Sequence, residues 1–256
     1  MSMAMATPNP LLKLDRVTKI FGGIHALTDL SLEVAPRQIV GIIGPNGTGK
    51  TTTFNVITGA YRASSGAVAL DGRTITAEPP HLIARAGISR TFQNIRLFGD
   101  MTVWEHLLVA QPHAGPAWRR LLPPRLANPQ ALHRAQEVLE FFALGDVRDR
   151  LARSLPYGLQ RKVEMARAVT ARPKLLLLDE PVAGMNHDEA ETIRGLMLKL
   201  RDEGLSILLI EHDMAFVMNL CDHLYVLDFG VMIAQGPPDE IRANPIVLDA
   251  YLGQAA

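Results

Sequence analysis

The segment Gly44–Thr51 constrains the fold more than any other stretch, because its sequence, GPNGTGKT, fits the phosphate-binding pattern G-x-x-x-x-G-K-[ST]. The apolar run Gln38–Ile43 precedes it and has the composition of a buried parallel strand. The next segment, Thr52–Ile57, can open a helix. In a strand, loop and helix of this order, backbone N–H groups and the helix dipole bind phosphate. The alternative is an ordinary glycine-rich turn, but the flanking segments favour a phosphate site.

The side chains of this loop have separate expected roles. The ammonium group of Lys50 is expected to reach the β- and γ-phosphates of a nucleotide, and the Thr51 hydroxyl to hold Mg²⁺. Glycines allow the backbone amides to turn inward on the phosphates. The residues expected to contact the nucleotide are Gly44, Pro45, Asn46, Gly47, Thr48, Gly49, Lys50, Thr51 and Thr52.

Charge and hydropathy exclude some classes of protein. Lys plus Arg and Asp plus Glu number 26 each, so no overall positive field attracts nucleic acid, which is therefore not an expected partner. The longest apolar runs are far shorter than the ~20 residues of a membrane span. Segment 1–10 lacks the basic and apolar parts of a signal peptide and is expected to be a flexible leader. The single cysteine, Cys221, is expected to be a buried thiol, which fits a reducing cytoplasm.

Strand and helix patterns alternate along the chain and predict an α/β fold, with a mostly parallel sheet covered by helices on both faces. An antiparallel β flap is expected before and after the phosphate loop, from Leu11–Val17, Leu30–Val34 and a hairpin at Gly66–Thr76. The predicted later strands are Lys174–Leu178, Leu205–Ile210 and Leu224–Leu227. The predicted helices are Pro129–Ala143, Tyr157–Ala171, His187–Glu203 with Asn186 as its N-cap, and a last helix that ends near Gly253.

A change of composition follows the first strands, where both tryptophans, Trp104 and Trp118, and a proline-rich break occur. The prolines of this break are Pro112, Pro116, Pro123, Pro124 and Pro129. We interpret this region as a helical subdomain, 91–157, inserted into a core made of 11–90 and 158–256. The whole of 11–256 is expected to form one P-loop NTPase domain.

Two acids follow the apolar run Leu175–Leu178. A buried strand that delivers a carboxylate beside a phosphate loop is a common way to hold Mg²⁺, so Asp179 is the expected metal acid. Glu180 is then positioned to act as the general base on an attacking water. His212 follows the strand Leu205–Ile210 and is a candidate sensor of the γ-phosphate. Taken singly, such groups are more often solvated loop residues.

The order of these motifs resembles the ATP-binding cassette of ABC transporters over nearly the whole chain. By this resemblance Phe21 stacks on adenine, Gln93 links Mg²⁺ to the helical subdomain, and His212 is the switch histidine. Phe21 is expected on the loop that joins the first two strands, and a packed loop aromatic remains the alternative for it. The segment Leu155–Leu159 corresponds to the signature motif and Ala183–Asn186 to the D-loop. The runs Arg90–Phe98, Met101–Val103 and Ala250–Gly253 more closely resemble the LivG-type ATPase of branched-chain amino acid importers.

The signature segment departs from the family pattern L-S-G-G-Q. Pro156 stands at the serine position and offers neither a hydroxyl nor a backbone N–H, Tyr157 stands at the first glycine, and Leu159 replaces glutamine. Proline is tolerated in the first turn of a helix, with Ser154 as a candidate cap, so that the helix dipole and the Gly158 amide can still face a phosphate. Leu155, Tyr157 and Gly158 are therefore kept as candidate nucleotide contacts, with a plain helix start as the alternative.

The resemblance implies an ATP-hydrolysing subunit with ATP and Mg²⁺, attached peripherally to the cytoplasmic face of the inner membrane. Its implied partners are a second ATPase subunit, as homodimer or heterodimer, integral-membrane permease subunits and, indirectly, a periplasmic amino-acid-binding protein. Two alternatives stay open, a cassette that works on DNA or ribosomes and a subunit that binds ATP without hydrolysing it. The single cassette and single cysteine argue against the first alternative, and Glu180 with His212 argues against the second.

Overall fold

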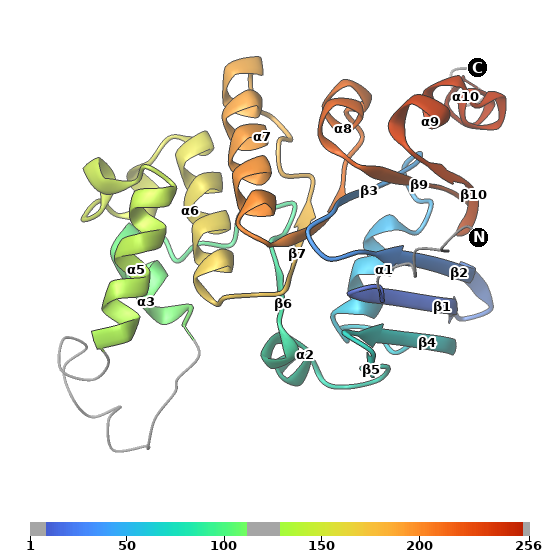
Figure 1. The fold of residues 1–256 in the computed structure, drawn as a ribbon, viewed down its shortest axis with the longest axis horizontal. Helices are drawn as coiled ribbons and strands as arrows, with labels where there is room; N and C mark the ends of the chain where they lie inside the picture. Colours follow the sequence, from blue (N-terminus) through green and yellow to red (C-terminus); the bar gives the residue numbers. More distant parts are fainter. Residues whose placement is uncertain (1–8, 112–128, 253–256) are drawn as a thin grey trace, which may run out of the picture.

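The computed structural model describes residues 9–111 and 129–252, and its core is a six-stranded sheet. Five neighbouring strands run parallel in the order β9-β3-β8-β7-β6, and β10 is antiparallel to β9 at one edge (Figure 1). This confirms the predicted α/β fold. The strands are β3 (Ile39–Ile43), β6 (Ile88–Arg90), β7 (Leu175–Asp179), β8 (Ser206–Ile210), β9 (His223–Asp228) and β10 (Val231–Gly236).

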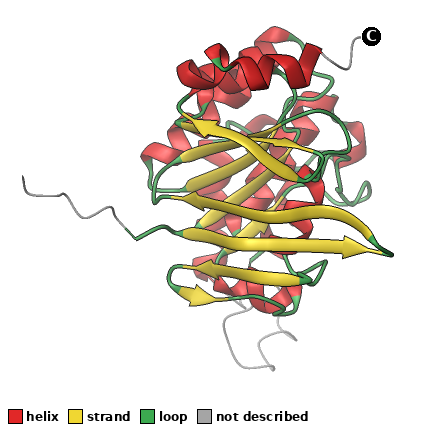
Figure 2. Ribbon diagram, turned by 90° about the vertical axis from the view of Figure 1, so that its right-hand side faces the viewer, coloured by secondary structure: helices red, strands yellow, loops and turns green. Residues whose placement is uncertain are grey.

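A second sheet, of four antiparallel strands, forms the predicted flap and lies in front in Figure 2. Its strands are β1 (Leu12–Phe21), β2 (Ile24–Val34), β4 (Ser65–Leu70) and β5 (Arg73–Thr74), in the order β2-β1-β4-β5. The hairpin between β4 and β5 turns at Asp71 and Gly72, with φ of 51° and 74°. Asp and Gly tolerate these left-handed values, which a two-residue hairpin loop requires.

Helices cover the six-stranded sheet and extend beyond it. They are α1 (Lys50–Ile57), α2 (Pro80–Ala86), α3 (Val103–Val109), α5 (Pro129–Phe141), α6 (Tyr157–Thr170), α7 (His187–Asp202), α8 (Met214–Leu220), α9 (Pro238–Ala243) and α10 (Pro245–Leu252). The sequence did not predict α2, α3, α8 or α9, because two turns or fewer are too short to show a helical period. Within the described ranges, no helix is both long and apolar enough to cross a membrane.

The helices α3, α5 and α6 pack on one another at the side of the core, on the left of Figure 1. They share one hydrophobic cluster with the inner face of the sheet, to which α5 contributes Ala135, Val138 and Leu139. Trp104 of α3 packs against this cluster. Parts of the predicted leader and break, with Trp118, Pro112, Pro116, Pro123 and Pro124, lie outside the described residues.

The two predicted helix caps had different outcomes. Asn186 caps α7 through a capping box, in which it exchanges hydrogen bonds with Glu189. The prediction that Ser154 caps α6 was wrong. Its hydroxyl donates to the Leu151 carbonyl oxygen (2.8 Å) and therefore belongs to the preceding 3-10 turn. Pro156 is the N-cap residue, and no side chain caps the helix.

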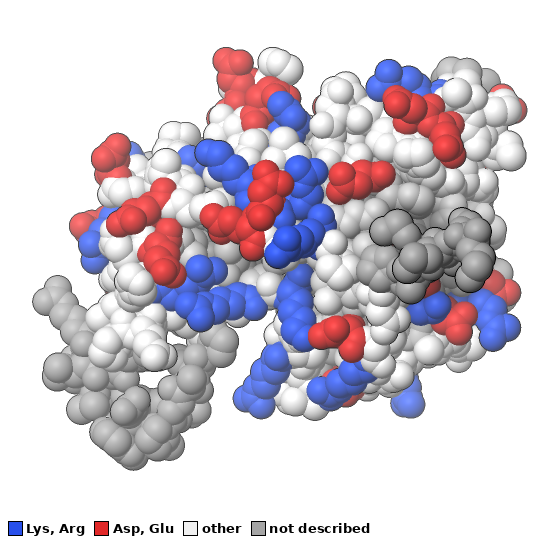
Figure 3. Space-filling model, viewed as in Figure 1, with Lys and Arg blue, Asp and Glu red and all other residues white. Residues whose placement is uncertain are grey.

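Acidic and basic side chains are mixed on one face of the molecule, with basic groups gathered near its middle (Figure 3).

The single cysteine, Cys221, is 7% exposed, as predicted, and its burial raises the pKa of the thiol. A thiol with a raised pKa carries little thiolate and is unreactive.

Candidate functional site

The phosphate loop connects the buried end of β3 to α1, as predicted. Gly44 and Gly49 have φ of 144° and 98°, in the region that favours glycine. A Cβ at Gly44 would lie 2.0 Å from the Leu227 carbonyl oxygen, and one at Gly49 would lie 2.6 Å from the Ala26 carbonyl oxygen. Both positions therefore require glycine for space as well as for backbone conformation.

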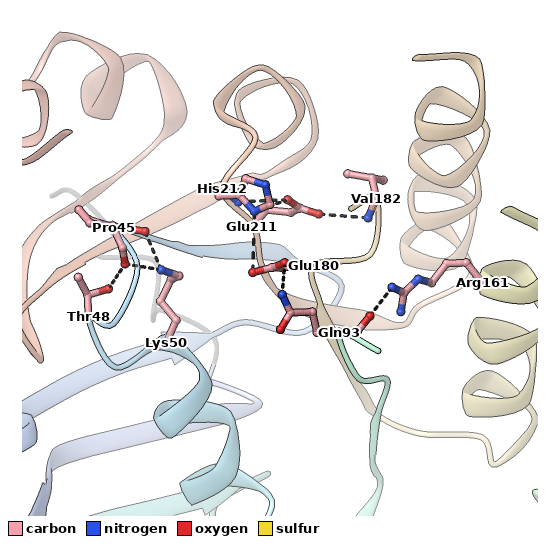
Figure 4. Close-up of polar contacts among 10 residues, drawn as sticks. Pro45, Thr48, Lys50, Gln93, Arg161, Glu180, Val182, Glu211 and His212 are labelled. Carbon is pink, nitrogen blue, oxygen red and sulfur yellow. Dashed lines mark hydrogen bonds and ion pairs between the residues drawn. The ribbon is translucent and has the colours of Figure 1, made fainter. Parts of the chain in front are cut away.

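Lys50 begins α1, and its side chain folds over the loop (Figure 4). Its Nζ donates to the carbonyl oxygens of Gly44 and Pro45, both at 2.6 Å. The Thr48 hydroxyl also donates to the Pro45 carbonyl oxygen (2.9 Å). Burial lowers the pKa of Lys50, and the negative charges of Glu180 and Asp179 partly oppose this shift. Thr51 is exposed and Thr52 partly exposed in the first turn of α1.

Asp179 and Glu180 lie at the carboxyl end of β7, next to the end of β8. Asp179 is 4% exposed, and its Oδ2 accepts a hydrogen bond from Arg90 Nη2 at 2.9 Å. Glu180 has a φ of 47°, and its N–H donates to the Ile210 carbonyl oxygen at 2.9 Å. A left-handed glutamate is strained, and such strain is frequent at functional sites. The backbone bond to β8 holds it in this conformation.

Three of the predicted groups meet at the Glu180 carboxylate (Figure 4). Gln93 Nε2 donates to Glu180 Oε2 at 2.7 Å, and His212 Nδ1 lies 3.8 Å from Glu180 Oε1. Gln93 comes from the segment after β6 and His212 from the segment after β8. Gln93, which lies 87 positions before Glu180 in the sequence, thus meets His212 at one carboxylate. We call Gln93, Glu180 and His212 the reactive cluster.

Glu211 is a residue of this region that sequence reasoning did not assign. Its carboxylate is 1% exposed and accepts hydrogen bonds from the N–H groups of Val182 and His212, each at 3.1 Å. Burial raises its pKa, while these hydrogen bonds oppose the shift. Glu211 therefore links the backbone at Val182, two residues after Glu180, to the backbone at His212. An acid at a strand end gives no sequence signal that distinguishes this role from a solvated one.

The candidate signature residues lie at the start of α6. Leu155 is buried, Tyr157 is 44% exposed, and a Cβ at Gly158 would lie 2.6 Å from Glu189 Oε1. In the described part of the chain, no hydrogen bond or ion pair joins these residues to the phosphate loop. The structure therefore does not bring them into this chain's own phosphate site.

A buried ion pair lies one turn further along α6, and it too was missed from sequence. Arg161 and Glu164 are both 0% exposed and meet at 2.8 Å. Arg161 also donates to the carbonyl oxygens of Phe92 and Gln93, both at 2.7 Å, and Glu164 accepts from the Arg96 N–H at 3.2 Å. We call this group the α6 junction. An Arg and a Glu three residues apart normally predict an exposed pair, so the pattern concealed their burial.

Phe21 ends β1 rather than lying in the loop between β1 and β2, which corrects its predicted placement. Its ring packs edge-on against Tyr61, with centroids 5.1 Å apart, and Lys19 Nζ lies 4.6 Å from the ring centroid. The side chain is 39% exposed. The ring is therefore partly packed and partly open to a ligand.

A glycine-rich loop between β3 and α1, followed by acids at the end of the parallel strand β7, defines a P-loop nucleotide-binding domain. Known proteins narrow this class. The family model described as ABC transporter matches residues 27–183, and one described as branched-chain amino acid ATP-binding cassette transporter matches 231–256. The chain belongs to the ATP-binding subunits of ABC transporters, which hydrolyse ATP.

Individual relatives match nearly end to end. The high-affinity branched-chain amino acid transport ATP-binding protein BraF of Pseudomonas aeruginosa is 45% identical, with 96% of this chain and 99% of BraF covered. LivG of Escherichia coli, described in the same words, is 44% identical with the same coverage. The crystal structure of a nucleotide-free ATP-binding cassette from an ABC transporter is 34% identical, with a TM-score of 0.84 over 95% of this chain and 99% of that one.

Proposed function

We propose that the chain is the ATP-hydrolysing subunit of an importer for branched-chain amino acids. The names of BraF and LivG and the second family model over residues 231–256 support this substrate class. Its partners are then integral-membrane permease subunits and, indirectly, a periplasmic amino-acid-binding protein. The subunit sits peripherally at the cytoplasmic face of the membrane. Its core is 11–90 with 158–256, and segment 91–157 is the helical subdomain that meets the permease.

The phosphate loop binds ATP, and three oxygen donors hold Mg²⁺. Thr51 and Asp179 provide a hydroxyl and a carboxylate, and Gln93 an amide oxygen, which are the hard ligands that Mg²⁺ prefers. Among the described residues no group of three or more His, Cys, Asp or Glu side chains could hold a metal alone. These three oxygen donors fit a cation whose remaining ligands are nucleotide phosphates and water. Bound Mg²⁺ neutralises charge that develops on the phosphates.

The reactive cluster performs hydrolysis. The Glu180 carboxylate accepts a proton from the attacking water as the new bond to the γ-phosphorus forms and the bond to the leaving ADP oxygen breaks. Gln93 orients this carboxylate through their 2.7 Å hydrogen bond, and His212, whose Nδ1 lies 3.8 Å from Glu180 Oε1, contacts the γ-phosphate. Lys50 stabilises the β- and γ-phosphate oxygens. The convergence of Gln93 and His212 on Glu180 is the observation that carries this proposal.

A second ATPase subunit completes each site. Leu155, Tyr157 and Gly158 face the nucleotide of the opposite subunit, where the α6 dipole and the Gly158 amide contact the γ-phosphate. Segment Ala183–Asn186 lies at the same interface, and Phe21 stacks on adenine. A homodimer and a heterodimer both satisfy this arrangement.

The decisive experiment compares ATP hydrolysis by the purified chain with that of Glu180→Gln. The variant keeps the side-chain shape but loses the base, so we expect unchanged ATP affinity and a fall in turnover of about 10²- to 10⁴-fold. Glu203→Gln is the matched control, because Glu203 is exposed at the end of α7 and should turn over normally. Turnover in Glu180→Gln equal to wild type would refute the assignment.

Dependence on protein concentration tests the second subunit. If two copies of this chain form the site, turnover at low concentration rises with the square of concentration. If a paralogous ATPase is needed, the chain alone binds ATP without turnover, and adding the paralogue and permease restores hydrolysis. Lack of turnover with all of these partners present would contradict the hydrolytic role.

A further inference from the structure

Arg90 carries a buried positive charge that the proposed mechanism does not use. It ends β6, and its side chain is 8% exposed. Nη2 donates to Asp179 Oδ2 at 2.9 Å, and Nη1 donates to Asn55 Oδ1 at 2.6 Å. The Asp179 side chain is itself 6% exposed. One guanidinium group therefore bridges the end of β7 and the helix that follows the phosphate loop.

Aromatic rings surround the Arg90 guanidinium. Its Cζ lies 5.3 Å from the centroid of the Phe54 ring and 5.0 Å from that of Phe92. Cation–π contacts of this length stabilise a guanidinium away from water. Phe54 belongs to α1, and Phe92 lies immediately before Gln93. The side chain is thus fixed by α1, β7 and the segment that leads to the reactive cluster.

The shape of arginine matters at this position. Two separate nitrogens of a planar group reach two acceptors on different elements, which a lysine ammonium on a flexible stem cannot reproduce in the same geometry. The bond fixes one oxygen of Asp179, namely Oδ2. Within the described residues Oδ1 accepts no hydrogen bond, so this oxygen is available to a ligand.

We propose that Arg90 is a positioning residue for Asp179. Arg90 holds the Oδ2 atom of Asp179, so that the Oδ1 atom of Asp179 faces the divalent cation of the nucleotide complex. Arg90 thereby determines how much Mg²⁺ strengthens nucleotide binding. The inference rests on the proposed role of Asp179 as the metal acid. Groups that orient a metal ligand typically change metal affinity by about 10- to 100-fold when they are replaced.

The test measures binding of the non-hydrolysable analogue AMPPNP by isothermal titration calorimetry, once with MgCl₂ and once with EDTA. The quantity of interest is the ratio of the two affinities. For Arg90→Lys we expect affinity with Mg²⁺ to fall about tenfold, and affinity in EDTA to stay within about twofold of wild type. Arg96→Lys is the matched control: the Arg96 guanidinium also lies over the Phe92 ring, 4.1 Å from its centroid, but within the described residues it makes no hydrogen bond or ion pair with Asp179. Its affinity ratio should equal that of wild type.

Two further variants make the result decisive. Asp179→Asn should reduce the affinity ratio at least as much as Arg90→Lys; if it does not, the proposed role of Asp179 fails. If Asp179→Asn reduces the ratio and Arg90→Lys leaves it unchanged, or weakens binding equally in both buffers, the inference about Arg90 is wrong. Should Arg90→Lys fail to fold in thermal unfolding, Asn55→Ala decides, because it removes only the second anchor of the guanidinium. A selective loss with Mg²⁺ supports the proposal, and an unchanged ratio overturns it.

Discussion

Gln93 belongs to the reactive cluster through its side chain and contacts the α6 junction through its backbone, and these two environments differ in burial. At the α6 junction, Arg161 and Glu164 are fully buried, and Arg161 donates to the carbonyl oxygens of two successive residues, Phe92 and Gln93. In the reactive cluster, the His212 side chain is 58% exposed and lies 3.8 Å from Glu180. The backbone of Gln93 is thus anchored to a helix, while its exposed side chain reaches Glu180, whose side chain is 18% exposed. This difference separates structural support from chemistry.

The largest effect should come from the α6 junction. Arg161→Met leaves the Glu164 carboxylate buried without its partner, and we expect unfolding to become easier by about 3–5 kcal/mol. Urea denaturation followed by circular dichroism measures the change. Arg194→Met is the matched control, because Arg194 pairs with Glu191 at the same helical spacing but at the surface, and its unfolding should match wild type.

The double variant Arg161→Met with Glu164→Leu sharpens this comparison. Replacing both buried charges by apolar groups removes the unpaired carboxylate, so most of the lost stability should return. The hydrogen bonds to the Phe92 and Gln93 carbonyl oxygens do not return, so ATP turnover should remain below that of wild type. A stable variant with wild-type turnover would show that the α6 junction does not position Gln93.

The sequence predicted the parts of the molecule where function imposes a local pattern. Gly44–Thr51 has a fixed spacing because its own backbone forms the phosphate site, and Asp179 ends a strand whose preceding residues are all leucine. Arg161, Glu211 and Arg90 carry no such pattern, because each of them also depends on a partner 29 or more positions away along the chain. Only the folding of the chain brings these distant partners together and buries the charges. Sequence periodicity would place them in solvent.

The next largest effect is expected at His212, in the reactive cluster. We expect His212→Gln to lower turnover by about 10- to 100-fold, the value of one hydrogen bond to a charged group. Its free energy of unfolding should not change, because the side chain is mainly exposed. Steady-state hydrolysis and urea denaturation together make the check. Loss of stability with unchanged turnover would reverse the distinction between the two regions.

The smallest effect comes from a buried histidine, His106, which contrasts with His212. His106 is 0% exposed; its Nε2 accepts from the Phe98 N–H at 3.0 Å and its Nδ1 lies 2.8 Å from the Thr102 carbonyl oxygen. The acceptor role of Nε2 requires a neutral ring. Burial lowers the pKa of His106 in the folded chain. Between this lowered pKa and the ordinary value of 6.5, the unfolded chain binds more protons, so folding weakens as the pH falls.

Urea denaturation from pH 8 to pH 5 should therefore show stability lost below about pH 6.5, with a slope of at most about 1.4 kcal/mol per pH unit from this group. His106→Gln has no proton to bind, so its stability should depend less on pH across that window. If His106→Gln and wild type instead lose stability in parallel, burial of the His106 ring does not control the acid response.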